Sequence, residues 1–431
     1  MELAGRASGV DLEALEAALR EAAHVAGARV LEGLLRDVGV GRRDAPARCR
    51  CGALMQSSGV RAKQVQTLLG WIAFERSRYG CPRCGRAHYP GDEALDVVNT
   101  SRSPGVRRQV SRLGAKEPFR EVARDLRELA GVKLSRKDAE RVSERAGEAI
   151  EAWMAQERRE LRGAQPPPDE TPKTLETLYI EFDGTGVPMV PNEVAGRKGK
   201  QKDGSAKTRE AKLGCVFTQT GFDEKGRPIR DPATTSFVGA IEGAEEFGWR
   251  IYAEAVRRGL FSANQVVCLG DGAPWVKNLA QIHFGNAPFI VDFYHAKEHV
   301  MALCRALFDR DMRRLTRCRD RWWELLAQGQ IETLVQQAKD LLPKDPRTKK
   351  DARTQIRYFE KNKDHMRYDQ FKAQGFFIGS GVIEAGCRTV IGQRLKQSGM
   401  EWTVRGANAI IALRCANLSN RLEDYWEQRA A

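Results

Sequence analysis

The sequence predicts an α/β protein whose largest part is a mixed-sheet domain with an all-α insertion, preceded by a cysteine-bearing module and a helical domain. Three observations lead to this prediction. The first part of the chain combines helical periodicity with two pairs of closely spaced cysteines. A linker at 165–176 then contains three consecutive prolines, which favour an extended backbone and interrupt the helical pattern. Beyond the linker, three strand-like segments are followed by alternating helices and strands, the order of a sheet with helices on its faces.

The charge of the chain points to an acidic partner. The 431 residues include 71 Lys and Arg against 57 Asp and Glu, a net charge of +14. Nucleic acid is the leading candidate for such a surface, although a merely basic soluble enzyme would show the same excess. No apolar run is long enough to span a bilayer, and the first residues lack the layout of a signal peptide. We therefore expect a cytoplasmic protein with reduced cysteines and no membrane partner.

Helices are expected on both sides of the cysteine module. Residues 1–44 are expected to be an N-terminal helical segment with an amphipathic helix at 11–37, because leucines and alanines recur there at helical spacing. This helix could be an oligomer contact or simply a packed helix. Residues 96–164 should contain helices at 118–129 and 135–153, with Ser135 as the N-cap of the second. The glycine-containing turn between them resembles a helix-turn-helix that binds DNA, a pattern that ordinary helix pairs share.

Paired cysteines in the module at 45–95 indicate a metal site rather than disulfides. The expected ligands are Cys49, Cys51, Cys81 and Cys84. Tetrahedral Zn²⁺ fits four thiolates that a hairpin brings together, and 65–79 has suitable strand character for a zinc-ribbon-like module. Because only one residue separates the first pair, His88 could replace Cys49 as a ligand. Free or redox-active cysteines are the alternative.

The mixed-sheet domain is expected to consist of two segments of the chain: a first part at 177–301 and a final part at 376–431. Strands are predicted at 178–183, 212–220, 234–240, 266–270 and 288–292, and helices at 244–259 and 274–284. This order matches the ribonuclease-H-like fold. Between the two parts, 302–375 is predicted to be a basic helical insertion that contributes to a nucleic-acid surface.

Three acids stand out as candidates for catalysis. Asp183 ends the first predicted strand and Asp271 follows the fourth, where open sheets build active sites. Glu384 lies near the start of a helix predicted to run through Lys396, so its carboxylate could point back at the sheet. Magnesium prefers carboxylate oxygens, and two such cations can activate the attacking oxygen of a phosphodiester cleavage and stabilise the leaving one. The alternative is that these acids only cap turns.

Four segments together resemble bacterial insertion-sequence transposases of the ISKra4 type, relatives of the Mutator-like group. They are LYIEFDGTGVPM, VVCLGDGAPWVKN, FIVDFYHAKEHV and GSGVIEAGCRTVIGQRLKQSGMEWTVRGANAIIALR, in the expected order. The resemblance covers the chain from the cysteine module to near the C-terminus. It implies a ribonuclease-H-like catalytic domain with a DDE triad at Asp183, Asp271 and Glu384, which would hold Mg²⁺ or Mn²⁺. It also implies a nucleoid-associated bacterial homo-oligomer, a dimer or higher, that binds terminal inverted repeats and target DNA.

The resemblance also draws attention to polar residues near the triad. Asp292 and His295 match an acid-then-histidine pair of the group, which could orient the reacting phosphate or satisfy buried hydrogen bonds. His299 could share either role. Candidate DNA contacts are Arg388, Arg394, Lys396, Trp402 and Arg405. Solvated helix charge, and core packing for Trp402, are the alternatives, and the basic loop at 197–212 could flank the DNA or be disordered.

These observations together predict a metal-dependent DNA transposase that cleaves at the ends of its element and joins the freed 3′ hydroxyl to target DNA. One alternative is a ribonuclease-H-like nuclease without strand transfer. Another is a domesticated, non-catalytic DNA-binding protein. A zinc-ribbon RNA-binding factor is a weaker alternative, because it leaves the strand-end carboxylates unexplained.

Overall fold

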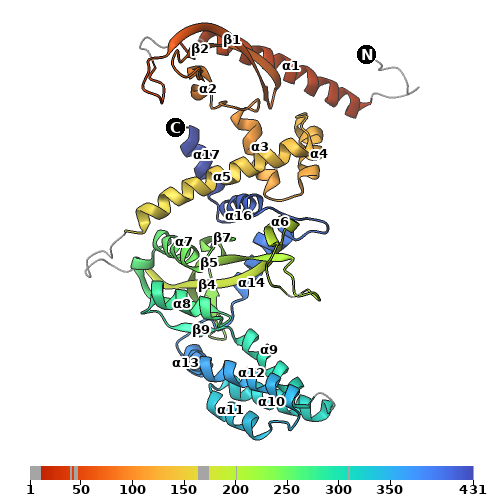
Figure 1. Ribbon diagram of the computed structural model, residues 1–431, viewed down its shortest axis with the longest axis vertical. Helices are drawn as coiled ribbons and strands as arrows, with labels where there is room; N and C mark the ends of the chain where they lie inside the picture. Colours follow the sequence, from red (N-terminus) through yellow and green to blue (C-terminus); the bar gives the residue numbers. More distant parts are fainter. Residues whose placement is uncertain are drawn as a thin grey trace. The chain divides into compact units, whose positions relative to one another are not determined.

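The computed structural model describes residues 11–38, 41–42, 47–163, 174–199, 201–308 and 311–430 (Figure 1). The chain forms two compact units, Met1–Ala146 and Gly147–Ala431. The predicted proline-rich linker lies almost entirely outside the described residues. The division between the units falls instead within one long helix, α5 (Arg136–Leu161), and the other domain bounds proposed from the sequence stay predictions.

The first unit pairs a long helix with a β-hairpin. Helix α1 (Leu12–Val38) packs Ala28, with Leu31 and Leu35, against the hairpin of β1 (Gln56–Thr67) and β2 (Gly70–Gly80). The sequence indicated strand character only from residue 65, because the first half of β1 is polar and exposed. The short strand β3 (Ala87–His88) pairs with β2, and α2 (Pro90–Ala94) follows it.

Three helices follow in the first unit. Helix α4 (Phe119–Ala130) and α5 agree closely with the predicted starts, and Ser135 caps α5 by accepting from the backbone N–H of Asp138 at 3.1 Å. Gly131 ends α4 in the left-handed conformation, at φ 65°. Helix α3 (Pro104–Gly114) was not predicted. Its start signal is Ser103, which accepts from the N–H of Val106, followed by proline at the first helical position.

The second unit is built on a mixed sheet of six strands in the order β6-β5-β4-β8-β9, with β7 also paired to β5. The strands are β4 (Leu175–Pro188), β5 (Thr208–Phe222), β6 (Pro228–Arg230), β7 (Ser236–Ala240), β8 (Ala263–Gly270) and β9 (Phe289–Val291). Strand β5 runs antiparallel to β4 and β7, whereas β8 is parallel to β4 and to β9. The five predicted strands are therefore present, and the prediction of a mixed α/β sheet domain is confirmed.

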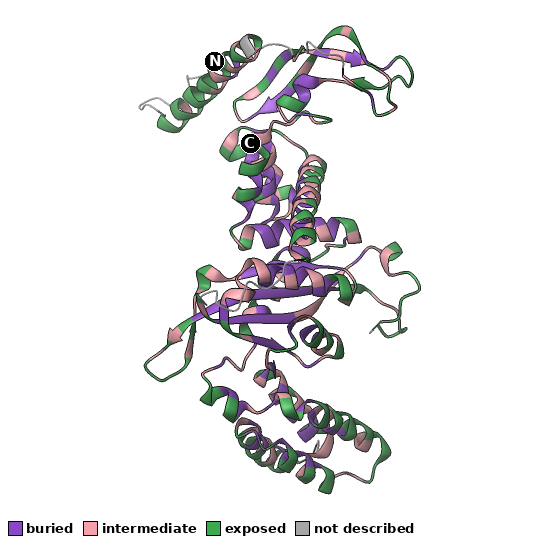
Figure 2. Cartoon of the chain, turned by 90° about the vertical axis from the view of Figure 1, so that its left-hand side faces the viewer, coloured by how far each residue is buried: buried purple, intermediate pink, exposed green. Residues whose placement is uncertain are grey.

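Helices cover the sheet, so the central strands are buried on both faces, as their purple colour in Figure 2 shows. Helices α7 (Ala244–Arg257) and α8 (Pro274–Phe284) pack on each other, α7 also on β5 and β7, and α8 on β8. Short turns of helix occur in the connections: α6 (Pro191–Val194), η1 (Pro232–Thr234) and η2 (Leu260–Ser262). The run from Leu178 to Phe182 on β4 is fully enclosed, as expected for a strand with neighbours on both sides and helices above and below.

The segment predicted as a basic insertion is helical. Its elements are α9 (Phe293–Phe308), α10 (Met312–Ala327), α11 (Ile331–Asp340), α12 (Pro346–Asn362), η3 (Lys363–His365) and α13 (Tyr368–Ala373). Figure 1 shows them gathered at one end of the second unit, beyond β9. Helix α9 starts directly after β9, so the helical segment joins the sheet without an intervening loop.

The C-terminal part begins with the helix that bears Glu384. A regular helix through Lys396 was predicted. The structure has instead α14 (Gly381–Gly386), a π-helical segment η4 (Cys387–Gly392) and a last turn, α15 (Gln393–Leu395). Helix α16 (Val404–Leu418) then packs on β7 with most of its side chains buried, and α17 (Leu422–Ala430) ends the described chain. In the described part of the chain, none of the helices has both the length and the apolar surface needed to cross a lipid bilayer.

Candidate active site and cysteine cluster

Parallel pairing aligns three aspartates at the carboxyl ends of neighbouring strands. Phe182 of β4 lies opposite Gly270 of β8, and Gly270 lies opposite Val291 of β9. The next residue on each strand is an aspartate: Asp183, Asp271 and Asp292. Residues that are far apart in the sequence are therefore brought to one edge of the sheet, the edge at which open sheets commonly bind ligands.

Asp183 and Asp271 form a half-buried pair of like charges. Burial raises the pKa of Asp183, and the charge of Asp271 raises it further, against hydrogen bonds from the Cys387 thiol and the Gly184 amide. The Asp183 Oδ1 accepts from the Gly184 N–H at 2.6 Å, and the Asp271 Oδ1 accepts from the Ala273 N–H at 2.8 Å. Each carboxylate thus has one oxygen bound to its own turn. The two carboxylates repel each other, and a cation bound between them would relieve this repulsion.

Glu384 faces the same region from the first turn of α14. Burial, then the charges of Asp292 and Asp183, raise its pKa, while the Ser380 hydroxyl donates to Oε1 at 3.3 Å and opposes the shift. Among the described residues, the four cysteines are the only group of three or more that brings its metal-binding atoms within 4.8 Å of one another. The three acids therefore lie within electrostatic reach without converging on one point. Glu384 is exposed, so its side chain can rotate toward the strand ends.

Asp292 is structural in this arrangement. Its carboxylate is buried, and both oxygens accept from backbone amides, those of His295 and Ser380. It therefore caps the start of α9 and ties this helix to the segment before α14. This geometry favours the interpretation that Asp292 satisfies buried hydrogen bonds, rather than orienting a phosphate.

His295 remains accessible next to the aspartate pair. Its side chain is 37% exposed. The positive charge of its protonated ring lowers the pKa of Asp183 and so favours the ionised carboxylate. The His295 Nε2 lies 3.3 Å from the Nε2 of His299, whose ring stacks on Tyr358 with centroids 3.5 Å apart. The Tyr358 hydroxyl donates to the backbone carbonyl of Asp271 at 3.1 Å. Helix α12, which carries Tyr358, is thereby held against the end of β8.

A further acid, Glu181, was not identified from the sequence. It lies two residues before Asp183 on the same face of β4 and is fully buried. Its Oε2 accepts from the Ile383 N–H at 2.8 Å and from the Cys215 thiol at 3.7 Å. The side chain of the N-cap residue Ser380 accepts no hydrogen bond from the first turn of α14. The Glu181 carboxyl, which lies on the sheet, takes this role by accepting from the Ile383 N–H. The available signal was a lone acid within an apolar strand, Leu-Tyr-Ile-Glu-Phe.

The predicted basic contacts divide into exposed and buried residues. Arg388 and Lys396 are exposed, and the Lys396 Nζ donates to the Thr185 hydroxyl, two residues beyond Asp183. Arg405 is also exposed and forms an ion pair with Glu148. Lys396 is therefore a predicted cation that lies close to Asp183 along β4.

The proposal of DNA contacts for Arg394 and Trp402 needs correction. Arg394 is fully buried, with its guanidinium 5.3 Å from the Trp402 ring. Trp402 is also buried, and its Nε1 donates to the Leu395 carbonyl at 3.0 Å. Both side chains fix the end of the Glu384 helix and have no surface to offer DNA in this conformation. Part of the basic loop at 197–212 is ordered strand, because β5 begins at Thr208.

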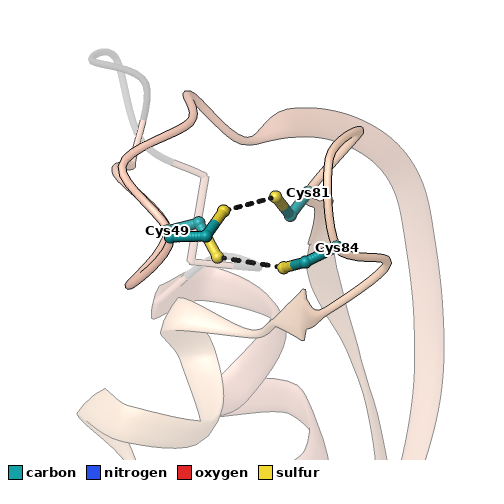
Figure 3. Close-up of side chains that lie close together, drawn as sticks. Cys49, Cys81 and Cys84 are labelled. Atoms are coloured by element: carbon teal, nitrogen blue, oxygen red, sulfur yellow. Dashed lines mark hydrogen bonds between the residues drawn. The ribbon is translucent and has the colours of Figure 1, made fainter.

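The four cysteines form a compact cluster that can hold a metal ion such as zinc. The Sγ of Cys49 lies 3.5 Å from that of Cys84, and the Sγ of Cys51 lies 3.5 Å from that of Cys81 (Figure 3). A regular tetrahedron around Zn²⁺ with Zn–S distances of about 2.3 Å has edges of about 3.8 Å, so the spacing fits. The hairpin of β1 and β2 brings the pairs together, as predicted.

The thiols of the cluster differ in their tendency to ionise: the Arg86 amide lowers the pKa of Cys84, but hydrogen bonds from the cluster outweigh it and raise this pKa to about 11, whereas the pKa of Cys81 is lowered. Burial opposes ionisation of Cys81, but the Cys84 amide and the thiols of Cys84 and Cys51 outweigh it and lower the pKa of Cys81 to about 6. A thiolate is the form that binds zinc. His88 does not substitute for Cys49, because its Nδ1 lies 3.4 Å from the Oε1 of Glu93 while Cys49 is part of the cluster.

Comparison with known proteins gives a family match over nearly the whole chain. The model of an uncharacterised protein family, UPF0236, matches residues 6–429. A Streptococcus gallolyticus protein, "UPF0236 protein in vanSb 3′ region", is 24% identical over 372 residues, covering 85% of this chain and 75% of that protein. A Caldanaerobacter subterraneus subsp. tengcongensis protein is 23% identical over 359 residues, covering 82% of this chain and 67% of that protein; its name, also UPF0236, joins eleven locus designations.

Among solved structures, the Drosophila P element transposase strand transfer complex matches 77% of this chain and 82% of that chain. The TM-score is 0.25 at 10% sequence identity, which is too low to support an argument about fold or function.

Proposed function

The chain belongs to the uncharacterised family UPF0236, and we propose that it is a DDE-type DNA transposase, of the insertion-sequence group that its motifs resemble. In this proposal it cleaves phosphodiester bonds at the ends of its element and joins the freed 3′ hydroxyl to target DNA. The observation that carries the proposal is the alignment of Asp183 with Asp271 on neighbouring parallel strands, with Glu384 facing them from α14.

The sheet order supports the proposal. Three antiparallel strands, β4, β5 and β7, are followed by β8 and β9 parallel to β4, and helices α7 and α8 lie in the connections. This is the order of the ribonuclease-H-like fold that the motifs imply. In that fold the first acid belongs to the first strand and the second follows the fourth, which are the positions of Asp183 and Asp271. The helices α9 to α13 correspond to the insertion before the last acid.

The names of two relatives add independent support. One protein bears eleven locus designations of a single genome, and another of the same organism bears four. A protein encoded at many places in one genome is expected when the gene belongs to an element that copies or moves itself. Neither a stationary nuclease nor a domesticated DNA-binding protein explains such repetition.

The chemistry assigned to the site follows from the charges. Two divalent cations, Mg²⁺ or Mn²⁺, would activate the attacking oxygen and stabilise the leaving oxygen at phosphorus. Asp183 and Asp271 would hold them through the oxygens that do not bind their own turns, and Glu384 would complete the set after rotating toward the strand ends. Lys396 would contact a phosphate next to the scissile bond, since its ammonium lies beside Thr185. His295 would hold a second phosphate or position the attacking water.

Two other parts of the chain would hold the DNA. We assign the four-cysteine cluster to a structural zinc ion that shapes the module of β1 and β2, and helices α3 to α5 to contact with the terminal repeats. The exposed basic side chains on α10 and α12 would extend the contact along the phosphate backbone.

The decisive experiment is cleavage of labelled DNA that carries the ends of the element, in the presence of magnesium, manganese or chelator. Wild-type protein should cleave only with a divalent cation and should join the product to a target plasmid. Asp183→Asn, Asp271→Asn and Glu384→Gln should each lower the rate by at least about a hundredfold while binding persists. Asp203→Asn, in an exposed turn, is the matched control and should cleave normally.

Three results would reject the proposal. Cleavage without joining would favour a nuclease. Tight, specific DNA binding by a wild-type protein that does not cleave would favour a non-catalytic DNA-binding protein. Full activity of Asp183→Asn would place the chemistry elsewhere.

A further inference from the structure

Helix α1 carries an apolar stripe that the described residues of the first unit leave exposed. The stripe consists of Leu12, Leu15, Leu19, Ala22, Ala23, Ala26, Val30 and Gly33. Leu12, Leu19 and Val30 are 66%, 70% and 63% exposed, among the most exposed large apolar side chains described. The opposite side of the helix, with Ala28 and Leu31, packs on the hairpin. One helix thus has two apolar sides: one packs on the hairpin, and the other is exposed among the residues that the structure describes.

We propose that this stripe, here called the α1 stripe, is the contact between two copies of the chain, with the two α1 helices packed antiparallel. The inference does not depend on the proposed enzymatic activity. A twofold contact must be self-complementary, since the same patch meets itself. The spacing of the stripe has this property about the midpoint between Ala22 and Ala23.

The residues that would meet across such a twofold axis are complementary in size. Pairs equally distant from the midpoint are Leu12 with Gly33, Leu15 with Val30, Leu19 with Ala26, and Ala22 with Ala23. Two of the three leucines therefore face a small residue, and small residues occupy the centre. Large side chains can enter the spaces that small ones leave, which lets the helix axes approach closely.

Charge selects the antiparallel direction. Asp11 and Arg36 are both exposed, and 25 residues separate them, almost seven full turns at 3.6 residues per turn, so they lie on the same flank of the helix. In the antiparallel pair, Asp11 of one copy lies near Arg36 of the other, at both ends of the contact. A parallel pair would instead leave Asp11 of one copy about 37 Å along the axis from Arg36 of the other, 25 residues at 1.5 Å each, so neither residue would meet its opposite charge. The helix dipoles also favour the antiparallel arrangement.

A charged substitution at the centre of the α1 stripe tests the surface. In analytical ultracentrifugation of the full-length protein, wild type should dimerise reversibly. Leu19→Glu and Ala26→Glu should each weaken association by at least about tenfold, because each contact would bury the new charge twice. Leu129→Glu is the matched control, since Leu129 is 74% exposed on α4, outside the stripe, and it should dimerise like wild type. Circular dichroism and zinc content show whether each variant is folded.

The direction of pairing is tested by a photo-cross-linking amino acid in place of Leu12. Antiparallel pairing predicts an intermolecular cross-link to the region of Gly33, identified by mass spectrometry. A cross-link between the two copies of residue 12 would overturn the direction. A cross-link to another part of the same chain, a monomeric wild type, or a folded Leu19→Glu variant that dimerises normally would overturn the surface.

Discussion

At the scale of single residues, the carboxyl group of Glu181 links the strand that bears Asp183 to the helix that bears Glu384. It does so while fully buried, so that its ionised form is disfavoured and its pKa is raised to about 8, mainly by burial. The Ile383 N–H, the Cys215 thiol and the charge of Arg230 oppose this shift without cancelling it. The position of α14 therefore depends on a carboxyl that is protonated at neutral pH.

Glu181 should make the stability of the protein fall as pH rises. Because the pKa is about 8 in the folded chain against 4.5 for an unperturbed carboxyl, the folded state holds a proton between these values that the unfolded state has lost. This contribution is complete below pH 4.5 and is lost by pH 8. Glu181→Gln, which cannot ionise, should show a smaller decrease in the free energy of unfolding between pH 5 and 8, measured by urea denaturation. Glu176→Gln, exposed on the same strand, is the control; equal slopes for wild type and Glu181→Gln would contradict the assignment.

Arg388 and Arg394 should respond differently to substitution although they lie on the same helix. Arg394→Met removes a buried side chain and should destabilise the fold by about 1–3 kcal/mol, without changing the salt dependence of DNA binding. Arg388→Met removes an exposed charge, and if it contacts phosphate it should lower the slope of log affinity against log salt by about one. Thermal unfolding and fluorescence-anisotropy titrations at several salt concentrations test both. A salt slope altered by Arg394→Met alone would show that the buried assignment is wrong.

The sequence was informative about the acids and misleading about Arg394 for a physical reason. Strand ends are visible in the sequence, so Asp183 and Asp271 could be identified from their positions. The faces of a helix are predicted from a regular repeat, but the π-helical segment Cys387–Gly392 widens one turn. An extra residue rotates all later side chains by about 100° relative to a regular helix. Six residues already rotate Arg394 by about 240° from Arg388 in a regular helix, so the two side chains should lie on different faces, and the sequence does not show which of these faces packs against the core.

At the scale of elements, the module of β1 and β2 depends on turns next to its four cysteines. The Cys49 N–H donates to Ala53 and the Cys81 N–H donates to Arg86, both at 2.8 Å, so each pair lies in a tight loop. Among the described residues, the nearby apolar cluster consists of Cys49, Met55, Tyr79 and Cys81, with Ala47, Cys51 and Ala53 packed against it. We expect a core this small to gain much of its stability from an ion bound by the four cysteines, which can hold one.

Loss of one thiol should therefore release the metal and loosen the module. Purified wild type should contain about one zinc ion per chain, and Cys51→Ser should contain none and unfold at a lower temperature. Cys318→Ser, in α10, should keep the full zinc content. Elemental analysis together with thermal unfolding gives the result, and zinc retained at wild-type level in Cys51→Ser would exclude the four-thiolate site.

The crossing of α5 and α16 depends on a glycine. A Cβ at Gly147 would lie 2.0 Å from the backbone oxygen of Ala409, which cannot move without shifting α16. Gly147→Ala should therefore destabilise the second unit by about 2 kcal/mol or more, despite the better helix propensity of alanine. Gly33→Ala, also inside a helix, meets no atom of its own chain within 4 Å, so in dilute, monomeric protein, where the proposed contact with Leu12 of a second copy is absent, it should stabilise α1 by up to about 1 kcal/mol. Chemical denaturation compares the two variants, and a Gly147→Ala protein as stable as wild type would disprove the close approach.

Elements with strong periodicity were predictable, and short ones were not. Strands β4, β5 and β8 have long apolar runs, and α8 matches its prediction at both ends. Strand β6 has only three residues and forms because it extends a hairpin on β5, which no local pattern reveals. The site is similar: strand ends predict which acids share an edge, whereas the orientation of Glu384 depends on Glu181, through a contact between residues 202 positions apart.

At the scale of the whole molecule, the boundary between the two compact units falls inside α5, which bears on how the chain can be divided. The second half of this helix carries partners for the second unit. Glu151 accepts from the guanidinium of Arg250 at 2.9 Å, and the Trp153 Nε1 donates to Gln428 at 2.7 Å. Arg250 is nearly fully buried, and Glu242 is its other carboxylate partner.

A fragment that begins at the predicted linker should thus be less stable than one that includes α5. Residues 174–431 lack Glu151, which leaves the buried charge of Arg250 with one partner instead of two. Removing one partner of a buried ion pair costs on the order of 3–5 kcal/mol. Residues 136–431 keep the pair, so calorimetry should show a cooperative transition for 136–431 and a markedly lower or broader one for 174–431. In the shorter fragment, Arg250→Met should recover part of the lost stability, because it removes the charge that is left with a single partner. If the two fragments were equally stable, α5 would not belong to the second unit, and the domain boundary would lie at the predicted proline-rich linker.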